Sequence, residues 1–275
     1  MPTLAELHLT ARERGVPHYR RLAKAELEAA LEGAPVVPGA PVRLERDGPL
    51  ALIVLDDPGS RNVLGPAAMA AFEAIVDELA ADTDARLVAV TGAGGVFSSG
   101  AAIREHDVMA DGGAILTDRG NALLDRLAAL PVPIVALVNG HAVGGGAELA
   151  LACDWRLMAP DAELRFVHAT IGLVPGFGGL GRLRQILGPA GALRMLATHE
   201  AVNGRRALQI GLADEVVPPS DLRSRARSMA GRIAGTDRGA IAAAKLALAV
   251  GTREAERDAF LACWPNRKIP TNARG

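Results

Sequence analysis

Short apolar runs that alternate with helical patterns are the feature that most constrains the fold of this chain. Three such runs, at 51–58, 86–94 and 132–140, each end in turn-forming residues. Continuous apolar runs of this length are typical of strands buried on both faces of a parallel sheet. Because apolar side chains at helical spacing follow them, the alternation predicts an α/β chain.

The same patterns give the boundaries that we expect for the remaining elements. Helical segments are predicted over 66–81, 114–130, 146–153, 179–187, 191–196, 204–211, 222–234 and 239–250, and a short edge strand over 213–219.

Three segments are expected along the chain. Residues 1–33 predict a small helical N-terminal unit that stops at a glycine, and the proline-rich stretch 34–41 predicts a linker. Residues 42–275 then form the main domain, in which the strands and helices alternate.

Composition excludes several classes of protein. Hydrophobic residues make up 49% of the 275 residues, which is enough for a sizeable core, and the net charge of −1 makes a nucleic-acid partner unlikely. Cys153 and Cys263 are too few for a disulfide framework or a metal site, so we expect a cytoplasmic protein without a metal. No apolar run approaches the roughly 20 residues of a membrane helix, and the N-terminus lacks the apolar stretch of a signal peptide.

The stretch NGHAVGGGAELALACD, residues 139–154, is the most informative local motif. A strand ends, glycines follow, and a helix begins with Glu148 in its first turn. Free N–H groups at a helix N-terminus bind anionic oxygen, and an enolate oxygen is such a group. Taken alone, the motif is better explained by a tight turn with an acidic residue that complements the helix dipole, because glycine-rich turns are common.

A second glycine-rich loop, VTGAGGVFSSGAAI at 90–103, also follows a strand. Two loops from neighbouring strands can each offer one N–H group to the same oxygen, which makes an oxyanion hole. Ser98 and Ser99 have no base at motif spacing and are not expected to be nucleophiles. His168 follows a short strand and precedes a Gly/Pro-rich turn, and spacing alone favours a structural role for it.

Together these stretches resemble the crotonase superfamily, also called the enoyl-CoA hydratase/isomerase family, over about residues 42–265. The resemblance rests on five motifs in order, LDDPGSRNVLGPAAM, FSSGAAI, NGHAVGGGAELALACD, IGLVPGFGG and ALQIGLADEVVP. It implies an α/β fold with a crotonase-like ββα spiral core, a C-terminal helical region and a small N-terminal helical appendage. It also implies a homotrimer or hexamer.

The resemblance implies roles for particular residues. The backbone N–H groups of Ala101 and Gly145 are expected to form the oxyanion hole for an acyl thioester, and Glu148 and His168 are expected to be catalytic. The residues expected to contact the substrate or its CoA portion are Arg61, Asn62, Ala102, Ile103 and Gly144. No cofactor is expected, because CoA or pantetheine is part of the substrate.

Two positions depart from the family pattern. His168 stands where hydratases of the family have their second carboxylate, and Ala102 stands where the family often has an aspartate that orders the oxyanion loop. We expect water addition to an α,β-unsaturated thioester, with Glu148 activating the water and His168 handling the second proton. Decarboxylation, isomerisation or C–C bond hydrolysis on the same scaffold stay open, as does a non-catalytic scaffold subunit. The thioester carrier is either CoA or a carrier protein.

Residues 1–33 more weakly resemble the helical unit of SAP or Rho N-terminal-like domains. Such units often bind nucleic acid. The basic residues within 12–24 are balanced by acidic residues over 1–35. We therefore expect a docking element or an oligomer contact rather than a nucleic-acid site.

Overall fold

The computed structural model describes residues 2–13, 24–31, 39–103 and 113–267. Most of the predicted linker at 34–41 lies outside these ranges, as does most of the basic stretch at 12–24.

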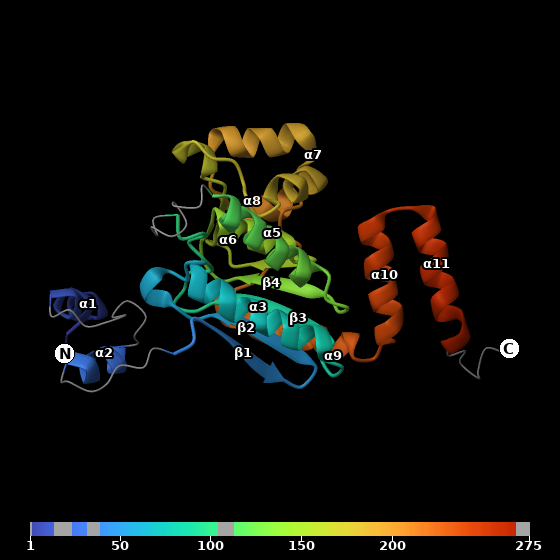
Figure 1. The fold of residues 1–275 in the computed structure, drawn as a ribbon, viewed down its shortest axis with the longest axis horizontal. Coiled ribbons are helices and arrows are strands. Elements are labelled where there is room, and N and C mark those ends of the chain that lie inside the picture. The colour runs from blue at the N-terminus through green and yellow to red at the C-terminus, as the bar shows by residue number, and fades with distance from the viewer. Residues whose placement is uncertain (1, 14–23, 32–38, 104–112, 268–275) are drawn as a thin grey trace.

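A six-stranded sheet forms the centre of the main domain (Figure 1). Its strands, in spatial order, are β1 (Val42–Asp47), β2 (Leu50–Leu55), β3 (Leu87–Gly92), β4 (Ile134–Val138), β6 (Trp155–Met158) and β9 (Glu215–Val216). β1 pairs antiparallel with β2, and every other neighbouring pair in this sheet is parallel. The three apolar runs are therefore the central strands β2, β3 and β4, and the predicted edge strand is β9.

The central strands are buried on both faces, as their continuous apolar pattern predicts. In β2, Ile53 and Leu55 belong to the larger core beneath α3 (Pro66–Ala81) and α5 (Ala114–Ala128), whereas Leu52 and Val54 belong to a smaller core. Helix α9 (Leu222–Ile233) covers that smaller core on the opposite face. The period of two along a strand thus divides one run between two layers.

A second, three-stranded sheet lies beside the first, and its strands alternate along the chain with β6 and β9 of the first sheet. Its elements are β5 (Ala142–Val143), β7 (Glu163–Arg165) and β8 (Val202–Asn203), with the helices α6 (Gly145–Ala152), α7 (Gly179–Thr198) and α8 (Gly204–Gln209) around them. The two helices predicted at 179–187 and 191–196 are the two arms of α7. Gly188, at φ 69° and ψ 169°, breaks the helix direction between them, and Pro189 follows.

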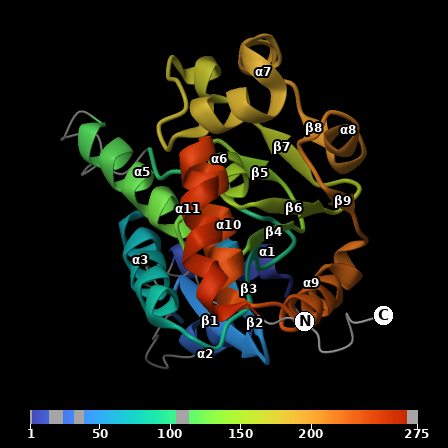
Figure 2. The same cartoon turned by 90° about the vertical axis from the view of Figure 1, so that its right-hand side faces the viewer.

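The C-terminal helices α10 (Arg238–Val250) and α11 (Arg253–Cys263) form a hairpin that stands away from the sheets in Figure 1 and faces the viewer in Figure 2. Its exposed apolar side chains include Leu248, Phe260 and Trp264. The Lys245 side chain attaches α10 to the domain through the Asp154 carboxylate at 2.8 Å and the Val132 carbonyl oxygen at 2.9 Å.

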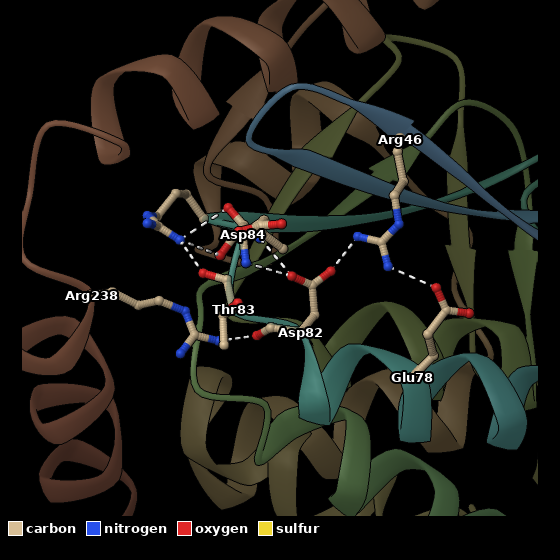
Figure 3. Close-up of polar contacts among 8 residues, drawn as sticks. Arg46, Glu78, Asp82, Thr83, Asp84 and Arg238 are labelled. Atoms are coloured by element: carbon tan, nitrogen blue, oxygen red, sulfur yellow. Dashed lines mark hydrogen bonds and ion pairs between the residues drawn. The ribbon is translucent and has the colours of Figure 1, made fainter.

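A polar network at the end of α3 makes a second attachment (Figure 3). Arg238, the first residue of α10, donates to the Asp82 carbonyl oxygen at 2.6 Å. The Asp82 carboxylate accepts from the backbone N–H groups of Asp84 and Ala85 and pairs with Arg46, which also pairs with Glu78 at 2.7 Å. Strand β1, helix α3 and helix α10 are thereby joined at one corner of the domain.

The N-terminal helices α1 (Leu4–Glu13) and α2 (Lys24–Leu31) pack against each other. Thr3 and Glu6 cap α1 reciprocally, because each side chain accepts a hydrogen bond from the other residue's backbone N–H. Leu7, Ala11 and Leu27 are buried. No helix among the described residues of the chain is long and apolar enough to cross a membrane.

Candidate active site

The loop before α6 presents backbone amides at the N-terminus of a buried helix. Gly144, the N-cap, has φ 53° and ψ −122°, a conformation that residues with a side chain rarely adopt. The next residue, Gly145, is the first of the helix, so its N–H group has no carbonyl partner within the helix. This part of the chain can therefore hold an anionic oxygen.

The loop that contains Ala101 lies directly beside the loop that contains Gly145. Ser98 N–H donates to the His141 carbonyl oxygen at 3.2 Å, and Val143 N–H donates to the Ser98 carbonyl oxygen at 2.9 Å. A methyl group added to Gly145 would lie 3.2 Å from the Ala101 amide nitrogen. The structure thus brings the amides of Ala101 and Gly145 together.

Glu148, in the first turn of α6, is 1% exposed. Its Oε1 atom accepts two backbone N–H groups, from Phe177 at 2.7 Å and from Gly179 at 2.9 Å. A methyl group on Gly179 would lie 2.6 Å from Glu148 Cγ, so only glycine allows this approach. The turn before α7 therefore fixes the carboxylate and leaves Oε2 for another partner.

That partner is His168. The residue begins a short 3₁₀ helix, His168–Ile171, just after β7, and its Nε2 atom lies 3.1 Å from Glu148 Oε2. The His168 side chain is 9% exposed and the Glu148 side chain 2%. A methyl group on Gly144 would lie 3.8 Å from Nε2, which places the ring next to the glycine loop. The two predicted catalytic side chains thus contact each other close to the predicted oxyanion amides.

Side chains of α5 hold the turn that positions Glu148. Thr117 Oγ1 and Asn121 Nδ2 donate to the Gly176 carbonyl oxygen at 2.5 Å and 3.0 Å. Arg182 donates to the Phe177 carbonyl oxygen at 2.7 Å. Thr117, Asn121 and Arg182 were not predicted from the sequence. No motif indicates the first two, because they lie 59 and 55 residues from Gly176.

Arg61 and Asn62, two of the five residues expected to contact the substrate or its CoA portion, differ in the exposure of their side chains. Arg61 is exposed, in a left-handed conformation with φ 58°. Asn62 is 2% exposed, and its Nδ2 atom donates to the carbonyl oxygens of Ala93, Val96 and Phe97. The Asn62 side chain therefore binds the loop after β3, and a contact between Asn62 and CoA stays a prediction.

The other predicted contact residues line the two loops. Ala102 is 8% exposed, Ile103 donates its N–H to the Ala101 carbonyl oxygen at 2.9 Å, and Gly144 forms the turn described above. Cys153, at the other end of α6, is buried, and burial raises the pKa of its thiol to about 12, so it is not a nucleophile at neutral pH. Among the described residues, no group of three His, Cys, Asp or Glu side chains could hold a metal ion.

The chain is similar in sequence and in fold to known proteins. The family model described as enoyl-CoA hydratase/isomerase matches residues 45–263. Ethylmalonyl-CoA decarboxylase from Bos taurus is 36% identical over 188 residues, which cover 67% of this chain and 61% of that protein. A short-chain-enoyl-CoA hydratase from Clostridium acetobutylicum is 34% identical over 194 residues, which cover 70% of this chain and 74% of the hydratase.

A solved structure matches as well. The crystal structure of an enoyl-CoA hydratase from Bacillus anthracis superposes with a TM-score of 0.77 at 28% identity, covering 80% of this chain and 90% of that one. The chain spans 61% of the length of the bovine decarboxylase, which is less than two thirds.

Proposed function

Because the chain belongs to the enoyl-CoA hydratase/isomerase family, we propose that it is an enzyme of acyl-CoA thioesters that works through an enolate. Family membership confirms the resemblance seen in the sequence, and the structural match confirms the crotonase-like α/β fold with its C-terminal helical region. The leading reaction is the addition of water to an α,β-unsaturated acyl-CoA, or its reverse.

The proposed hydration uses the groups around the N-terminus of α6. The water oxygen bonds to the β-carbon, and the electron pair of the double bond moves through the α-carbon onto the thioester oxygen. The amides of Ala101 and Gly145 hold that oxygen as its negative charge develops. Glu148 takes the proton of the water, and His168 handles the proton that the α-carbon receives.

One observation carries this proposal: two neighbouring backbone amides and a contacting Glu148–His168 pair meet at one helix N-terminus. Incubation with crotonyl-CoA in ¹⁸O-labelled water, followed by mass spectrometry, tests it. We expect a β-hydroxyacyl-CoA that carries the label. An unlabelled, unchanged thioester would overturn the hydratase proposal if CoA still raises the melting temperature of the protein.

A second candidate is decarboxylation of a malonyl-type thioester, in which the bond from the α-carbon to the carboxylate breaks and CO₂ leaves. The electron pair again forms an enolate, and the α-carbon then takes a proton. The Glu148 carboxylate favours this candidate, because three groups already surround it, the N–H groups of Phe177 and Gly179 and the His168 ring. Little of it is left to orient a water molecule. The bovine relative is named for such a reaction.

The two reactions give different products, so one experiment separates them. Ethylmalonyl-CoA is incubated with the protein in parallel with crotonyl-CoA, and both mixtures are analysed for acyl-CoA masses. Loss of CO₂ from ethylmalonyl-CoA with no hydration of crotonyl-CoA would make decarboxylation the activity. A shifted double bond or a cleaved carbon chain would indicate isomerisation or C–C hydrolysis. If no thioester reacts, a non-catalytic scaffold is the remaining interpretation.

We also propose a homo-oligomer, a trimer or hexamer, in which other copies of the chain cover the C-terminal hairpin. Leu248 is 82% exposed, Phe260 60% and Trp264 49%, and exposed apolar clusters of this kind favour association. Sedimentation velocity of the wild type and of Leu248→Lys tests this, and a monomeric wild type would contradict it.

We also propose that the chain is divided into an N-terminal unit, a linker and a catalytic domain. We propose a docking role for residues 1–33 and a cytoplasmic location for the protein. The thioester carrier is either CoA or the pantetheine of a carrier protein. Comparing rates on the CoA ester and on the same acyl group carried by a carrier protein would decide it.

A further inference from the structure

The loop that carries the Ala101 amide needs a support of its own. Ala102, the next residue, has no polar side-chain group that could hold this loop. The residues beyond Ile103 as far as 112 lie outside the described part of the chain. Within the described residues, the side-chain support for this loop comes from residues before Ala101.

Ser98 is the side chain best placed to provide it. It is fully buried, and its hydroxyl donates to the Asn62 carbonyl oxygen at 2.8 Å. The hydroxyl oxygen of Ser98 in turn accepts the N–H group of Gly100 at 3.1 Å. The peptide unit that follows Gly100 contains the Ala101 amide, so the hydroxyl fixes the peptide next to the one that would bind the thioester oxygen.

The backbone of Ser98 extends this connection to the second loop. Its N–H donates to the His141 carbonyl oxygen, and its carbonyl oxygen accepts from Val143 N–H at 2.9 Å. A methyl group on Gly146 would lie 2.5 Å from that carbonyl oxygen, so α6 begins in direct contact with Ser98. One buried residue thus touches both loops that carry the predicted oxyanion amides.

Asn62, which accepts the hydrogen bond from the Ser98 hydroxyl, is itself held by several hydrogen bonds. It has a left-handed backbone with φ 55°, and its amide group accepts from Asp57 N–H and donates to three carbonyl oxygens. Two residues later, Leu64 N–H donates to the Gly100 carbonyl oxygen at 2.8 Å. Both backbone groups of Gly100 are therefore held: its N–H group binds the Ser98 hydroxyl, and its carbonyl oxygen binds the Leu64 N–H group.

We propose that Ser98 is a positioning residue, which holds the Ala101 amide at the separation from the Gly145 amide that one thioester oxygen requires. This inference rests on the proposed function. Oxyanion donors act at about 2.7–3.1 Å from the oxygen, and a misplacement of about 1 Å costs roughly a hundredfold in rate. Removing the hydroxyl frees Gly100 N–H and lets the Ala101 peptide rotate, while the substrate-binding surface stays in place.

Ser98→Ala tests the inference, with Ser99→Ala as the matched control. Within the described part of the chain, the hydrogen bond of the Ser99 hydroxyl goes to the Ser60 carbonyl oxygen, at 3.3 Å, and not to Gly100. We expect Ser98→Ala to lower kcat by about tenfold to a hundredfold on the substrate that the wild type converts, with KM within about twofold. Ser99→Ala keeps the wild-type kcat.

A spectroscopic readout separates positioning from general damage. Dimethylaminocinnamoyl-CoA absorbs at longer wavelength when its thioester oxygen accepts strong hydrogen bonds. The wild type and Ser99→Ala are expected to shift the absorption of the bound probe to the red, and Ser98→Ala to shift it less. If Ser98→Ala does not fold, Ser98→Cys, which keeps the volume with a weaker donor, replaces it and is expected to give a smaller shift than the wild type.

The outcomes are distinct. An unchanged red shift and unchanged kcat in Ser98→Ala, or in Ser98→Cys where it stands in, would overturn the positioning role of Ser98, as would an equal loss in Ser99→Ala. A wild-type protein that neither converts a thioester nor shifts the probe would instead overturn the proposed function, and this inference with it.

Discussion

His168 Nε2 lies 3.1 Å from Glu148 Oε2, and this contact joins two buried side chains that are 20 residues apart in the sequence. The other carboxylate oxygen of Glu148 is occupied by two backbone N–H groups. His168 therefore takes the one side of the carboxylate that remains. The contact therefore determines which ring nitrogen of neutral His168 carries the proton.

The first prediction concerns the tautomer of neutral His168. A proton on Nε2 gives the carboxylate a hydrogen bond. A proton on Nδ1 would instead turn the lone pair of Nε2 toward Glu148 and bury an N–H group that has no partner among the residues that the structure describes. We expect the Nε2–H form in ¹⁵N NMR of the labelled ring, assigned by comparison with His168→Gln. In Glu148→Gln, the amide oxygen stays on the two N–H groups and the NH₂ group faces His168, so the ring is expected to change to the Nδ1–H form. A wild-type ring in the Nδ1–H form would contradict this account.

The second prediction concerns the carboxylate itself. Glu148→Gln keeps an acceptor for Phe177 and Gly179 but cannot take a proton. We expect kcat to fall by about a hundredfold to ten-thousandfold, as is typical of a lost general acid or base, with little change in melting temperature. Steady-state kinetics and thermal denaturation check both parts. A variant that retained more than a tenth of the wild-type kcat would remove Glu148 from the proton-transfer step.

The third prediction compares two glycines of α7. A methyl group on Gly179 would lie 2.6 Å from Glu148 Cγ, whereas one on Gly181 would meet nothing within 4 Å. Gly179→Ala is expected to push the carboxylate away from His168 and to lower kcat at least tenfold. The control Gly181→Ala is expected to leave kcat unchanged and to raise stability by about 0.5–1 kcal/mol, because alanine favours a helix. Equal kinetics for the two variants would argue against a fixed carboxylate.

The sequence could predict most of the fold but only part of the site. Strands β2, β3 and β4 and helix α3 were predictable, because periodicity depends only on neighbouring residues. The partnership of Glu148 with His168 came from a family resemblance and not from spacing. The structure adds the turn that contains Phe177 and Gly179, and neither periodicity nor the motifs indicated that its amides would hold the carboxylate.

Long-range polar contacts account for the rest of what sequence patterns could not supply. Asn62 was expected to contact CoA because of its motif, yet its amide meets carbonyl oxygens 31 to 35 residues away. Thr117 reaches Gly176 across 59 residues. Such bonds depend on how finished elements pack, so a local pattern carries no signal for them.

The fourth prediction concerns pH and stability. Arg119 on α5 makes two hydrogen bonds to Glu73 on α3, at 2.6 Å and 2.8 Å, and these hold the pKa of Glu73 below its ordinary value of 4.5. A carboxyl group whose pKa is lower in the folded state stabilises the fold above its unfolded pKa, and that contribution is lost as the pH falls through the folded pKa. Glu73→Gln is therefore expected to cost about 1 kcal/mol at pH 7, and the difference from wild type is expected to shrink as the pH falls below 4.5 and through the lower pKa of the folded state. Urea denaturation across this pH range measures it, and a difference that persisted in acid would exclude the ion pair as its cause.

The proposed function requires an enolate that forms in this site. Hydration and decarboxylation both pass through it, and both end by placing one solvent proton on the α-carbon. Wild-type protein is incubated with crotonyl-CoA and with ethylmalonyl-CoA in deuterium oxide, and the products are analysed by mass spectrometry and NMR. We predict a product with one deuterium on its α-carbon from at least one thioester, and its loss in Glu148→Gln. A folded wild-type protein that leaves both thioesters without deuterium and unconverted would contradict the account.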